Sequence, residues 1–289
     1  MKKILNIATV VILFTCGCTK LIKDDGAGID TSGYTLLKAA IENLTLPGYD
    51  PSVALWSKDD QVGLFAEGQS RAVCWDVRVS SDGKRDAEFY GPLVKGDKII
   101  GVFPYDSSVE YNGGAITCEL PGVQKHLPDL SMTEFFLTYN PYVFGVADNG
   151  AIDLRYAYGL LEIDFDLAYP VEIARLSISS DTQFISGRMR YDCENLSGTG
   201  ASSKTIILDL EGKTYMSTEL KAYAVIRPGV YEDLSVTIGL ADGGELTLNV
   251  PQTSIERISS GCFTAGHVTV SSSDLPSLDQ EDGYWEEEK

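Results

Sequence analysis

Two cysteines near the N-terminus lie in a context that could direct covalent attachment of lipid. Residues 1–17 have a basic start, an apolar core and small residues at their end, which is typical of a secretory signal peptide. A cysteine that directly follows a small residue at the cleavage point is typical of acylated, membrane-anchored bacterial proteins. Cys18, after a glycine, fits best, and Cys16, after a threonine, is the alternative. We therefore predict lipidation at Cys18, where each buried methylene would add about 0.8 kcal/mol of membrane affinity. An ordinary signal peptide that happens to contain two cysteines is the other interpretation.

The other cysteines are widely spaced: Cys74, Cys118, Cys193 and Cys262. Export would allow disulfides, and four cysteines permit three pairings that the sequence does not rank. Their spacing does not fit the close pairs of a zinc site. Small buried residues are the favoured interpretation, above all for Cys118, which lies on the apolar face of the alternating segment 116–120.

The histidines and glycine-rich stretches do not complete a catalytic or phosphate-binding motif. Only His126 and His267 are present, far apart in sequence, so a histidine-rich metal site is excluded. Residues 68–72 approach the G-x-S-x-G motif of hydrolases but lack its final glycine, so Ser70 is interpreted as a loop serine. Residues 198–205 resemble a phosphate loop without the glycine before its lysine, and a flexible turn is predicted instead.

The charge of the chain is strongly acidic, with 42 Asp and Glu against 23 Lys and Arg and a net charge of −19. Such a charge repels nucleic acid and anionic lipid head groups, so neither is expected as a partner. A glycosidase needs only two suitably placed carboxylates, but no spacing selects a pair here. Residues 279–283 resemble a calcium loop without its later glutamate, so a solvated tail is predicted. No catalytic residue, metal site or cofactor is therefore predicted.

Apolar and polar residues alternate with a period of two from about residue 60 onward. Residues 73–80 and 161–167 alternate in this way, which is typical of strands with one solvated face. Residues 234–250 alternate on both sides of a central Asp-Gly-Gly, which predicts a hairpin, because glycine adopts the positive backbone angles of tight turns. Residues 34–44 fit a short helix and a strand about equally well. Many short strands with turn residues between them predict an all-β protein.

The composition divides the chain into successive parts. Residues 1–17 are the predicted lipoprotein signal peptide, and residues 18–33 form a polar, flexible tether. A loop-like stretch before residue 150 separates residues 34–149 from residues 150–272, and each part is long enough for one β-sandwich. Residues 273–289 form an acidic tail.

Several stretches resemble, in order and spacing, the fimbrillin superfamily of lipoprotein pilins and related surface proteins of Gram-negative anaerobes. In the first half the similar stretches are Trp56–Phe65, Phe89–Leu93, Gly101–Asp106 and Ile116–Gln124. The last of these is similar to the I-x-x-x-L-P-x-x-Q element of the family. In the second half they are Leu160–Phe165, Leu176–Ser179, Ile185–Gly187 and Arg227–Tyr231. The resemblance spans about residues 56–270.

This resemblance implies two tandem transthyretin-like β-sandwiches and a role in fimbriae or similar surface appendages. In polymerising members of the family, a protease cuts after a basic residue of the first domain, and a strand of another subunit then pairs with the exposed sheet edge. Here no arginine precedes Trp56. Lys38, Lys58 and Arg71 fit such a cleavage site poorly. The sequence therefore favours an anchor, a tip subunit or an adhesin over a polymerising subunit.

The expected partners are other fimbrial subunits or ligands on host and bacterial surfaces, and the lipid would anchor the chain in the outer membrane, exposed at the cell surface or within a fimbrium. The alternative function is carbohydrate binding by an outer-membrane lipoprotein, with exposed aromatic residues such as Tyr111 or Trp285 stacked on sugar rings. Most aromatic residues fall on expected strands, so core packing explains them more simply. The third hypothesis is an envelope enzyme with an unmarked carboxylate pair. The sequence favours the first, non-enzymatic function.

Overall fold

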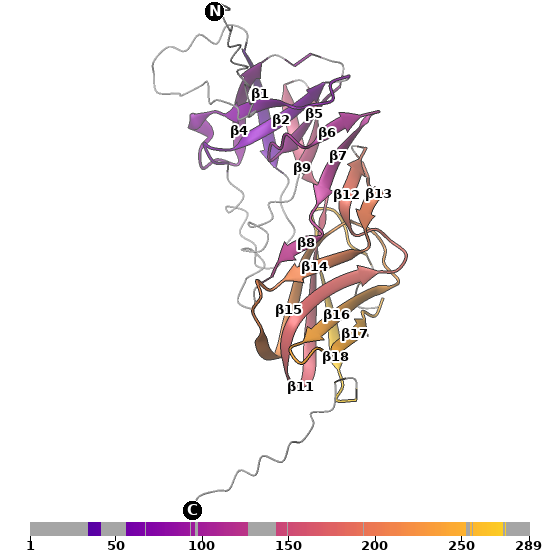
Figure 1. The fold of residues 1–289 in the computed structure, drawn as a ribbon. Coiled ribbons are helices and arrows are strands. Elements are labelled where there is room, and N and C mark those ends of the chain that lie inside the picture. The colour runs from indigo at the N-terminus through magenta and orange to yellow at the C-terminus, as the bar shows by residue number, and fades with distance from the viewer. Residues whose placement is uncertain are drawn as a thin grey trace, which may run out of the picture.

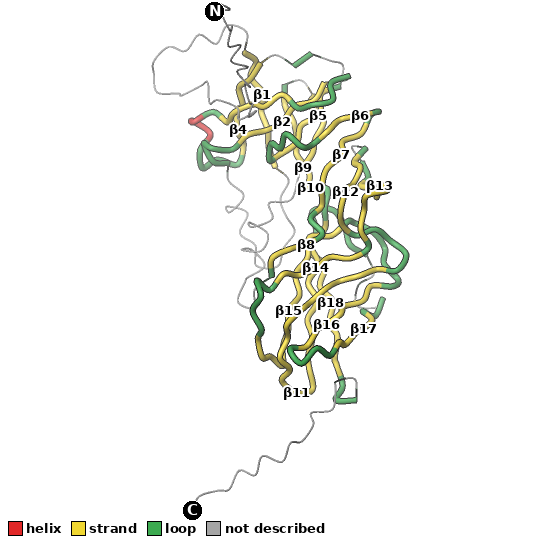
Figure 2. Tube along the Cα trace, in the orientation of Figure 1, coloured by secondary structure: helices red, strands yellow, loops and turns green. Residues whose placement is uncertain are grey.

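The computed structural model describes residues 34–41, 56–66, 68–92, 94–95, 98–126, 143–148, 150–192, 194–252, 255, 257–273 and 275 (Figure 1). Within these residues the chain has eighteen strands and one 3-10 helix, η2 (Val79–Ser81), so the predicted all-β class is confirmed (Figure 2). No helix in this part of the chain is long and apolar enough to cross a membrane.

Seven strands form a closed barrel in the N-terminal part of the chain. In hydrogen-bonding order they are β1 (Tyr34–Ile41), β10 (Ala151–Tyr156), β9 (Val143–Asp148), β5 (Ile99–Phe103), β2 (Gln61–Ala66), β3 (Val73–Val77) and β4 (Asp86–Pro92). β1 runs parallel to β10 and antiparallel to β4, and so closes the ring. The segment that fitted either a helix or a strand is therefore a strand up to Ile41. Because both neighbours of each strand are present, the backbone groups of the barrel are paired on both sides.

Trp56 anchors the core of the barrel. Its ring lies edge-on to Phe89 and Phe103, with centroid distances of 4.9 and 4.7 Å. Such edge-to-face pairs are favoured between aromatic rings. The indole N–H donates a hydrogen bond to the carbonyl of Arg85 at 2.8 Å. Trp56–Phe65, the first stretch that resembles the fimbrillin superfamily, thus begins with a core residue whose indole N–H has a hydrogen-bond partner.

A second sheet joins strands from both halves of the sequence. Its order is β13 (Leu196–Ser203), β12 (Ser186–Tyr191), β7 (Ala115–Leu120) and β6 (Glu110–Asn112). The flexible turn predicted for residues 198–205 was wrong, because β13 continues through residue 203 and β14 begins at residue 205. The hydroxyls of Thr199 and Ser202 donate to the carbonyl of Arg188 at 2.8 and 2.6 Å, which holds these residues against β12.

The third sheet contains most of the C-terminal part. Its order is β17 (Glu245–Asn249), β16 (Leu234–Leu240), β11 (Gly159–Ser180), β14 (Thr205–Asp209) and β8 (Val123–Lys125), and β15 (Tyr215–Ile226) and β18 (Phe263–Val270) also pair with β11. The first half of β11 pairs with β15 and β18, and its second half pairs with β14 and β16. A bulge between Asp166 and Val171 separates the two halves in the pairing with β15. β11 therefore belongs to both groups of strands (Figure 1).

The predicted hairpin and the predicted strand at residues 161–167 are confirmed. β16 and β17 pair from Ser235 opposite Asn249, and Gly243 in their turn has a φ of +92°. In β11 the odd-numbered residues from 161 to 167 are buried. The strand predicted for residues 73–80 ends earlier, because η2 begins at Val79. The Val79 side chain is 41% exposed.

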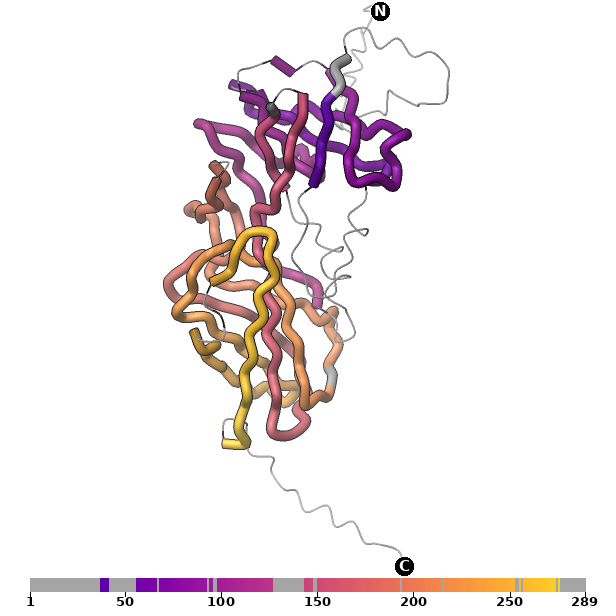
Figure 3. Tube along the Cα trace, turned by 180° about the vertical axis from the view of Figure 1, so that it is seen from behind, coloured from indigo at the N-terminus to yellow at the C-terminus, as the bar shows by residue number. Residues whose placement is uncertain are grey.

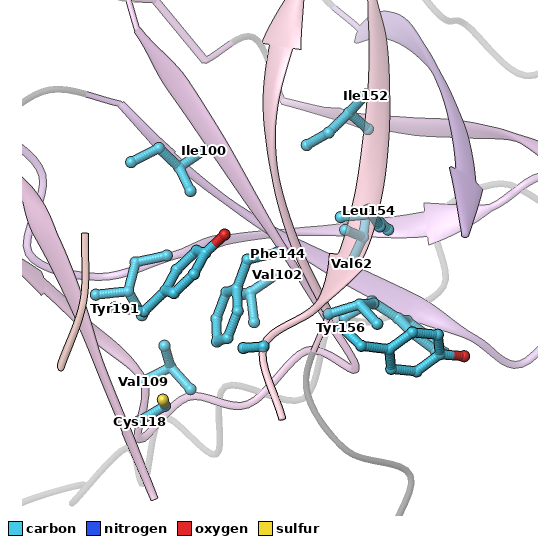
Figure 4. Packing of buried hydrophobic residues seen from close by; sticks show 14 of the residues in the cluster. Val62, Ile100, Val102, Val109, Cys118, Phe144, Ile152, Leu154, Tyr156 and Tyr191 are labelled. Carbon is cyan, nitrogen blue, oxygen red and sulfur yellow. The ribbon is translucent and has the colours of Figure 1, made fainter. Parts of the chain in front are cut away.

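Two hydrophobic cores underlie this architecture. The first contains residues of the barrel and of the second sheet, including Met189 of β12. Figure 4 shows Tyr191 of the same strand in this core. The second lies within the third sheet and runs from Leu161 to Leu275. Strand pairing crosses the division predicted near residue 150, because β10 completes the barrel and β8 joins the third sheet. The assignment of residues 34–149 and 150–272 to two domains stays a prediction.

Candidate binding and assembly surfaces

The predicted lipidation site and the predicted acidic tail lie outside the described residues. This holds for Cys18 and its alternative Cys16, and also for residues 279–283 and Trp285. Cys193 lies outside them as well. Lipidation and the acidic tail therefore stay predictions.

The described cysteines differ from one another in state. Cys74 is disulfide-bonded, so its interpretation as a small buried thiol was wrong. Cys118 and Cys262 are free, and Cys118 is buried as predicted. The Cys118 sulfur lies 3.1 Å from the hydroxyl of Tyr158, and burial raises the pKa of the thiol to about 12. The nucleophilic form of cysteine is the thiolate, so Cys118 is an inert core residue.

The histidines do not form a catalytic or metal site in the described structure. His126 is 1% exposed, and burial lowers its pKa to about 4, so the ring is neutral at pH 7. His267 is exposed and lies 3.2 Å from a carboxylate oxygen of Asp166. Among the described residues, no group of His, Cys, Asp and Glu side chains is arranged to hold a metal ion. Ser70 is exposed in a loop, as expected.

Lys221 joins two acidic residues on the outer face of β11. Its ammonium lies 3.6 Å from Glu162 and 3.3 Å from Asp164. Burial, together with the charge of Asp164, raises the pKa of Glu162. Burial opposes charging of Lys221, but both carboxylates raise the pKa of that lysine. The three residues form a partly buried ion-pair network in which the charge of the lysine offsets that of the carboxylates. We interpret this network as structural.

The glutamine of the I-x-x-x-L-P-x-x-Q element connects distant parts of the chain. Gln124 of β8 is 0% exposed, and its amide pairs with the backbone of Val225 in β15. The side-chain N–H donates to the Val225 carbonyl at 2.7 Å, and the side-chain oxygen accepts from the Val225 N–H at 2.8 Å. The same N–H group also donates to the Pro121 carbonyl at 3.0 Å. One side chain thus replaces two strand hydrogen bonds of β15.

The family-like stretch Arg227–Tyr231 is held together in a similar way. Tyr231 is buried, and its hydroxyl donates to the carbonyl of Arg227 at 2.6 Å. Burial raises the pKa of Tyr231 to about 12, which keeps this donor protonated. The Arg227 guanidinium donates to the carbonyl of Phe184 at 2.6 Å and lies 5.9 Å from the centroid of the Tyr231 ring. These family-like residues are fold determinants, and none of them faces a ligand site.

Three sheet edges, at β17, β13 and β8, are candidates for assembly. In the described part of the chain, β17 pairs with β16 alone and β13 pairs with β12 alone. An edge strand presents unpaired N–H and C=O groups, which another extended chain can use. β8 borders the same sheet as β17, and its Val123 is exposed beside the exposed Ile207 of β14. These edges can accept strands, whereas the closed barrel cannot.

A groove on the outside of the barrel is the candidate ligand site. Two cavities of about 360 Å³ each meet over β10. The first is lined by residues 144–146, 151, 153, 155 and 191, and the second by residues 38–40, 80–81, 84, 86–88 and 151–153. We call the two together the outer groove. Figure 3 shows this side of the barrel, with β1 in indigo.

The walls of the outer groove come from separate elements. The ring of Tyr191 in β12 stacks on Phe144 of β9, with a centroid distance of 4.6 Å and an interplanar angle of 24° (Figure 4). Asp153 and Arg155 are exposed on β10. The residues are far apart in sequence, so only the folded barrel brings them together. Tyr111, the predicted sugar-stacking residue, is 8% exposed and belongs to the first core, so it cannot play that role.

The fold is similar to several solved structures of bacterial surface proteins. A Bacteroides ovatus protein described as a candidate cell adhesion protein covers 82% of this chain and 92% of its own, at 12% identity and a TM-score of 0.49. The fimbrial anchor protein Mfa2 of Porphyromonas gingivalis covers 81% of this chain and 89% of its own, at 12% identity and a TM-score of 0.42. The C-terminally truncated tip fimbrial protein Mfa3 of the same organism covers 75% of this chain and 81% of its own, at 8% identity and a TM-score of 0.34. No family model and no curated protein matches the chain.

Proposed function

We propose that the chain is a non-enzymatic, lipid-anchored cell-surface protein of the fimbrillin kind, acting as a fimbrial anchor, a tip component or an adhesin. The observation that carries the proposal is the place of the family-like residues in the fold. Trp56, Gln124 and Tyr231 each have a buried side chain that donates a hydrogen bond to a backbone carbonyl, which is typical of residues that stabilise a fold. The descriptions of the similar solved structures agree with this function.

The remaining parts follow from the sequence. Residues 1–17 direct export, acylated Cys18 holds the chain in the outer membrane, and residues 18–33 extend the folded part from the membrane surface. The folded part comprises two transthyretin-like β-sandwich domains, residues 34–149 and 150–272, followed by the acidic tail. Other fimbrial subunits, or ligands on host or bacterial surfaces, are the partners.

In the uncut chain, β1 occupies the place in the barrel that a donated strand would need. β1 pairs with β4 over residues 34–40 and with β10 over residues 38–41. Removal of β1 would leave β4 and β10 with unpaired edges. The family resemblance implies that proteolysis makes such a change in polymerising members. With β1 in place, the barrel has no room for a donated strand. Other subunits would pair with β13 or β17 instead.

Fatty-acid labelling in the native bacterium tests the proposal. Cells fed an alkynyl fatty acid should label the wild-type protein and the Cys16→Ser variant, whereas Cys18→Ser should lose the label and escape into the medium. Protease added to intact cells should degrade the wild-type protein. A strain that lacks the chain should lose adhesion or retain fimbriae poorly on its surface. Unchanged adhesion and unchanged fimbriae in that strain would contradict the proposed function.

A further inference from the structure

The outer groove contains charged side chains of both signs that have no partner among the described residues. Asp153 and Arg155 line the first cavity, and Lys38 and Asp86 line the second. None of the four side chains makes a hydrogen bond or ion pair with another described residue. By contrast, Glu88 in the same groove is paired with Arg78 at 2.8 Å. The groove therefore offers free hydrogen-bond donors and acceptors side by side.

The unpaired groups are close to neutral as a set. Lys38 and Arg155 supply positive charge, and Asp86 and Asp153 supply an equal negative charge. The whole chain has a net charge of −19, which disfavours polyanions. A neutral ligand whose groups both donate and accept hydrogen bonds would satisfy both signs of charge. Hydroxyl groups have this property.

The backbone beneath the outer groove cannot recognise a peptide strand. β4, β1, β10 and β9 are consecutive strands of the closed barrel, so their N–H and C=O groups are already paired. Strand addition requires an unpaired edge. Recognition in this groove therefore depends on side chains, which favours a hydroxyl-rich ligand over an extended peptide.

The aromatic wall gives the groove a rigid end. Tyr191 stacks on Phe144, so one face of its ring is fixed by the core. Ligand pockets combine such apolar walls with a few convergent polar groups. The four strands beneath the groove lie about 4.8 Å apart, so a ligand that crosses them extends over roughly 15 Å. That length suits a short chain of rings better than a single ring.

We propose that the outer groove binds a short neutral oligosaccharide, with hydroxyl groups bound by Asp153, Arg155, Lys38 and Asp86, and with the largely buried Tyr191 closing one end of the groove. This inference deepens the adhesin role proposed above and rests on it. Asp153 accepts hydrogen bonds from ligand hydroxyls, and Arg155 donates hydrogen bonds to them. Hydrogen bonds to charged groups are the stronger kind, so each of the four charged residues contributes to the affinity.

Binding of neutral oligosaccharides to the full acylated chain, purified in detergent from its own host, tests the groove. The probes are chitotriose, cellotriose and lacto-N-tetraose, with an extended peptide as the comparison. We expect at least one of the oligosaccharides to bind, and Asp153→Asn or Arg155→Gln to weaken that binding at least tenfold. The matched controls are Asp166→Asn and Arg175→Gln, which alter exposed charges outside the groove and should leave binding unchanged. Thermal unfolding of each variant verifies that it folds.

The possible outcomes separate this inference from the proposed function. Oligosaccharide binding that the Asp153 and Arg155 variants weaken supports the inference. Binding of none of the oligosaccharides, binding of the peptide alone, or binding that both variants leave intact would overturn it. If deletion of the chain abolishes adhesion and the Asp153→Asn, Arg155→Gln double variant restores it, the outer groove is not the ligand site. The proposed function would then still stand. Adhesion unaffected by deletion would count against the proposed function instead.

Discussion

Buried polar side chains with complete partners are the most informative single residues of this protein. Gln124 satisfies both backbone groups of Val225 from inside the core. A buried polar group without a partner costs about 1–3 kcal/mol. Residues of this kind stabilise the fold, so a sequence motif that contains them indicates a fold and not a binding site.

Replacing Gln124 by leucine should destabilise the protein strongly. The substitution leaves the N–H and C=O of Val225 without their side-chain partner, and we expect a loss of about 3 kcal/mol in the free energy of unfolding. Urea unfolding at pH 7 measures it. The exposed Gln252→Leu is the control and should change stability by less than about 0.5 kcal/mol. Equal effects of the two substitutions would refute the role of Gln124.

His126 should make the protein less stable in mild acid. Burial lowers its folded-state pKa to about 4, while the unfolded chain protonates near the usual 6.5. Between these two pKa values, unfolding takes up a proton. The contribution of His126 to the free energy of unfolding is therefore complete above pH 6.5 and falls as the pH decreases. From pH 6.5 to pH 5 the loss should be about 2 kcal/mol, at 1.36 kcal/mol per pH unit.

Urea unfolding at the two pH values, compared among three proteins, measures this contribution. His126→Phe should lack it, because phenylalanine does not titrate. His267→Gln removes the exposed histidine and should keep the wild-type difference between pH 6.5 and pH 5. The same pH dependence in His126→Phe as in the wild type would show that other groups cause it.

At the scale of elements, local alternation predicts strands and distant pairing decides where they go. The hairpin at residues 234–250 and the strand at residues 161–167 follow from the alternation of side chains alone. The pairing of β7 with β12 and of β8 with β14 joins segments about seventy to ninety residues apart, which a period of two does not encode. β13 was missed for a related reason, because its Ser, Thr and Gly residues resemble a turn until their hydroxyls bond to β12.

The bulge between β12 and β13 should tolerate no side chain at Gly187. Its φ is +83°, and an added Cβ would lie 2.9 Å from the carbonyl oxygen of Ala201. Gly187→Ala should therefore cost more than the 1–2 kcal/mol typical of a left-handed residue alone. Gly212→Ala is the matched control, with a φ of +69° and open space around the new Cβ. Thermal unfolding of both variants separates crowding from backbone strain, and similar melting temperatures would argue against crowding.

The candidate site depends on the same long-range pairing. Lys38, Asp86 and Asp153 meet because β1 lies between β4 and β10 in the barrel. Nothing in the local sequence around these residues distinguishes them from other surface charges. The predicted lipidation site is the opposite case, since the residues that predict it are contiguous in sequence and the prediction does not depend on the fold.

At the scale of the whole molecule, the proposed anchor function depends on two features, the closed barrel of the uncut chain and the predicted lipidation at Cys18. A barrel closed by β1 does not accept a donated strand, while β13 and β17 remain as edges at which another subunit could pair. A chain held by acyl groups at Cys18 would keep its N-terminal segment. Polymerisation by loss of β1 would require that segment to be cut away.

The most direct measurement is the state of the protein isolated from its own cell envelope. Denaturing gels run without and with prior heating, combined with mass spectrometry of the N-terminus, report assembly and processing together. We expect a single band whose chain begins at acylated Cys18 and still contains β1. A ladder of heat-sensitive multimers whose chains begin beyond residue 41 would contradict it and identify a polymerising subunit.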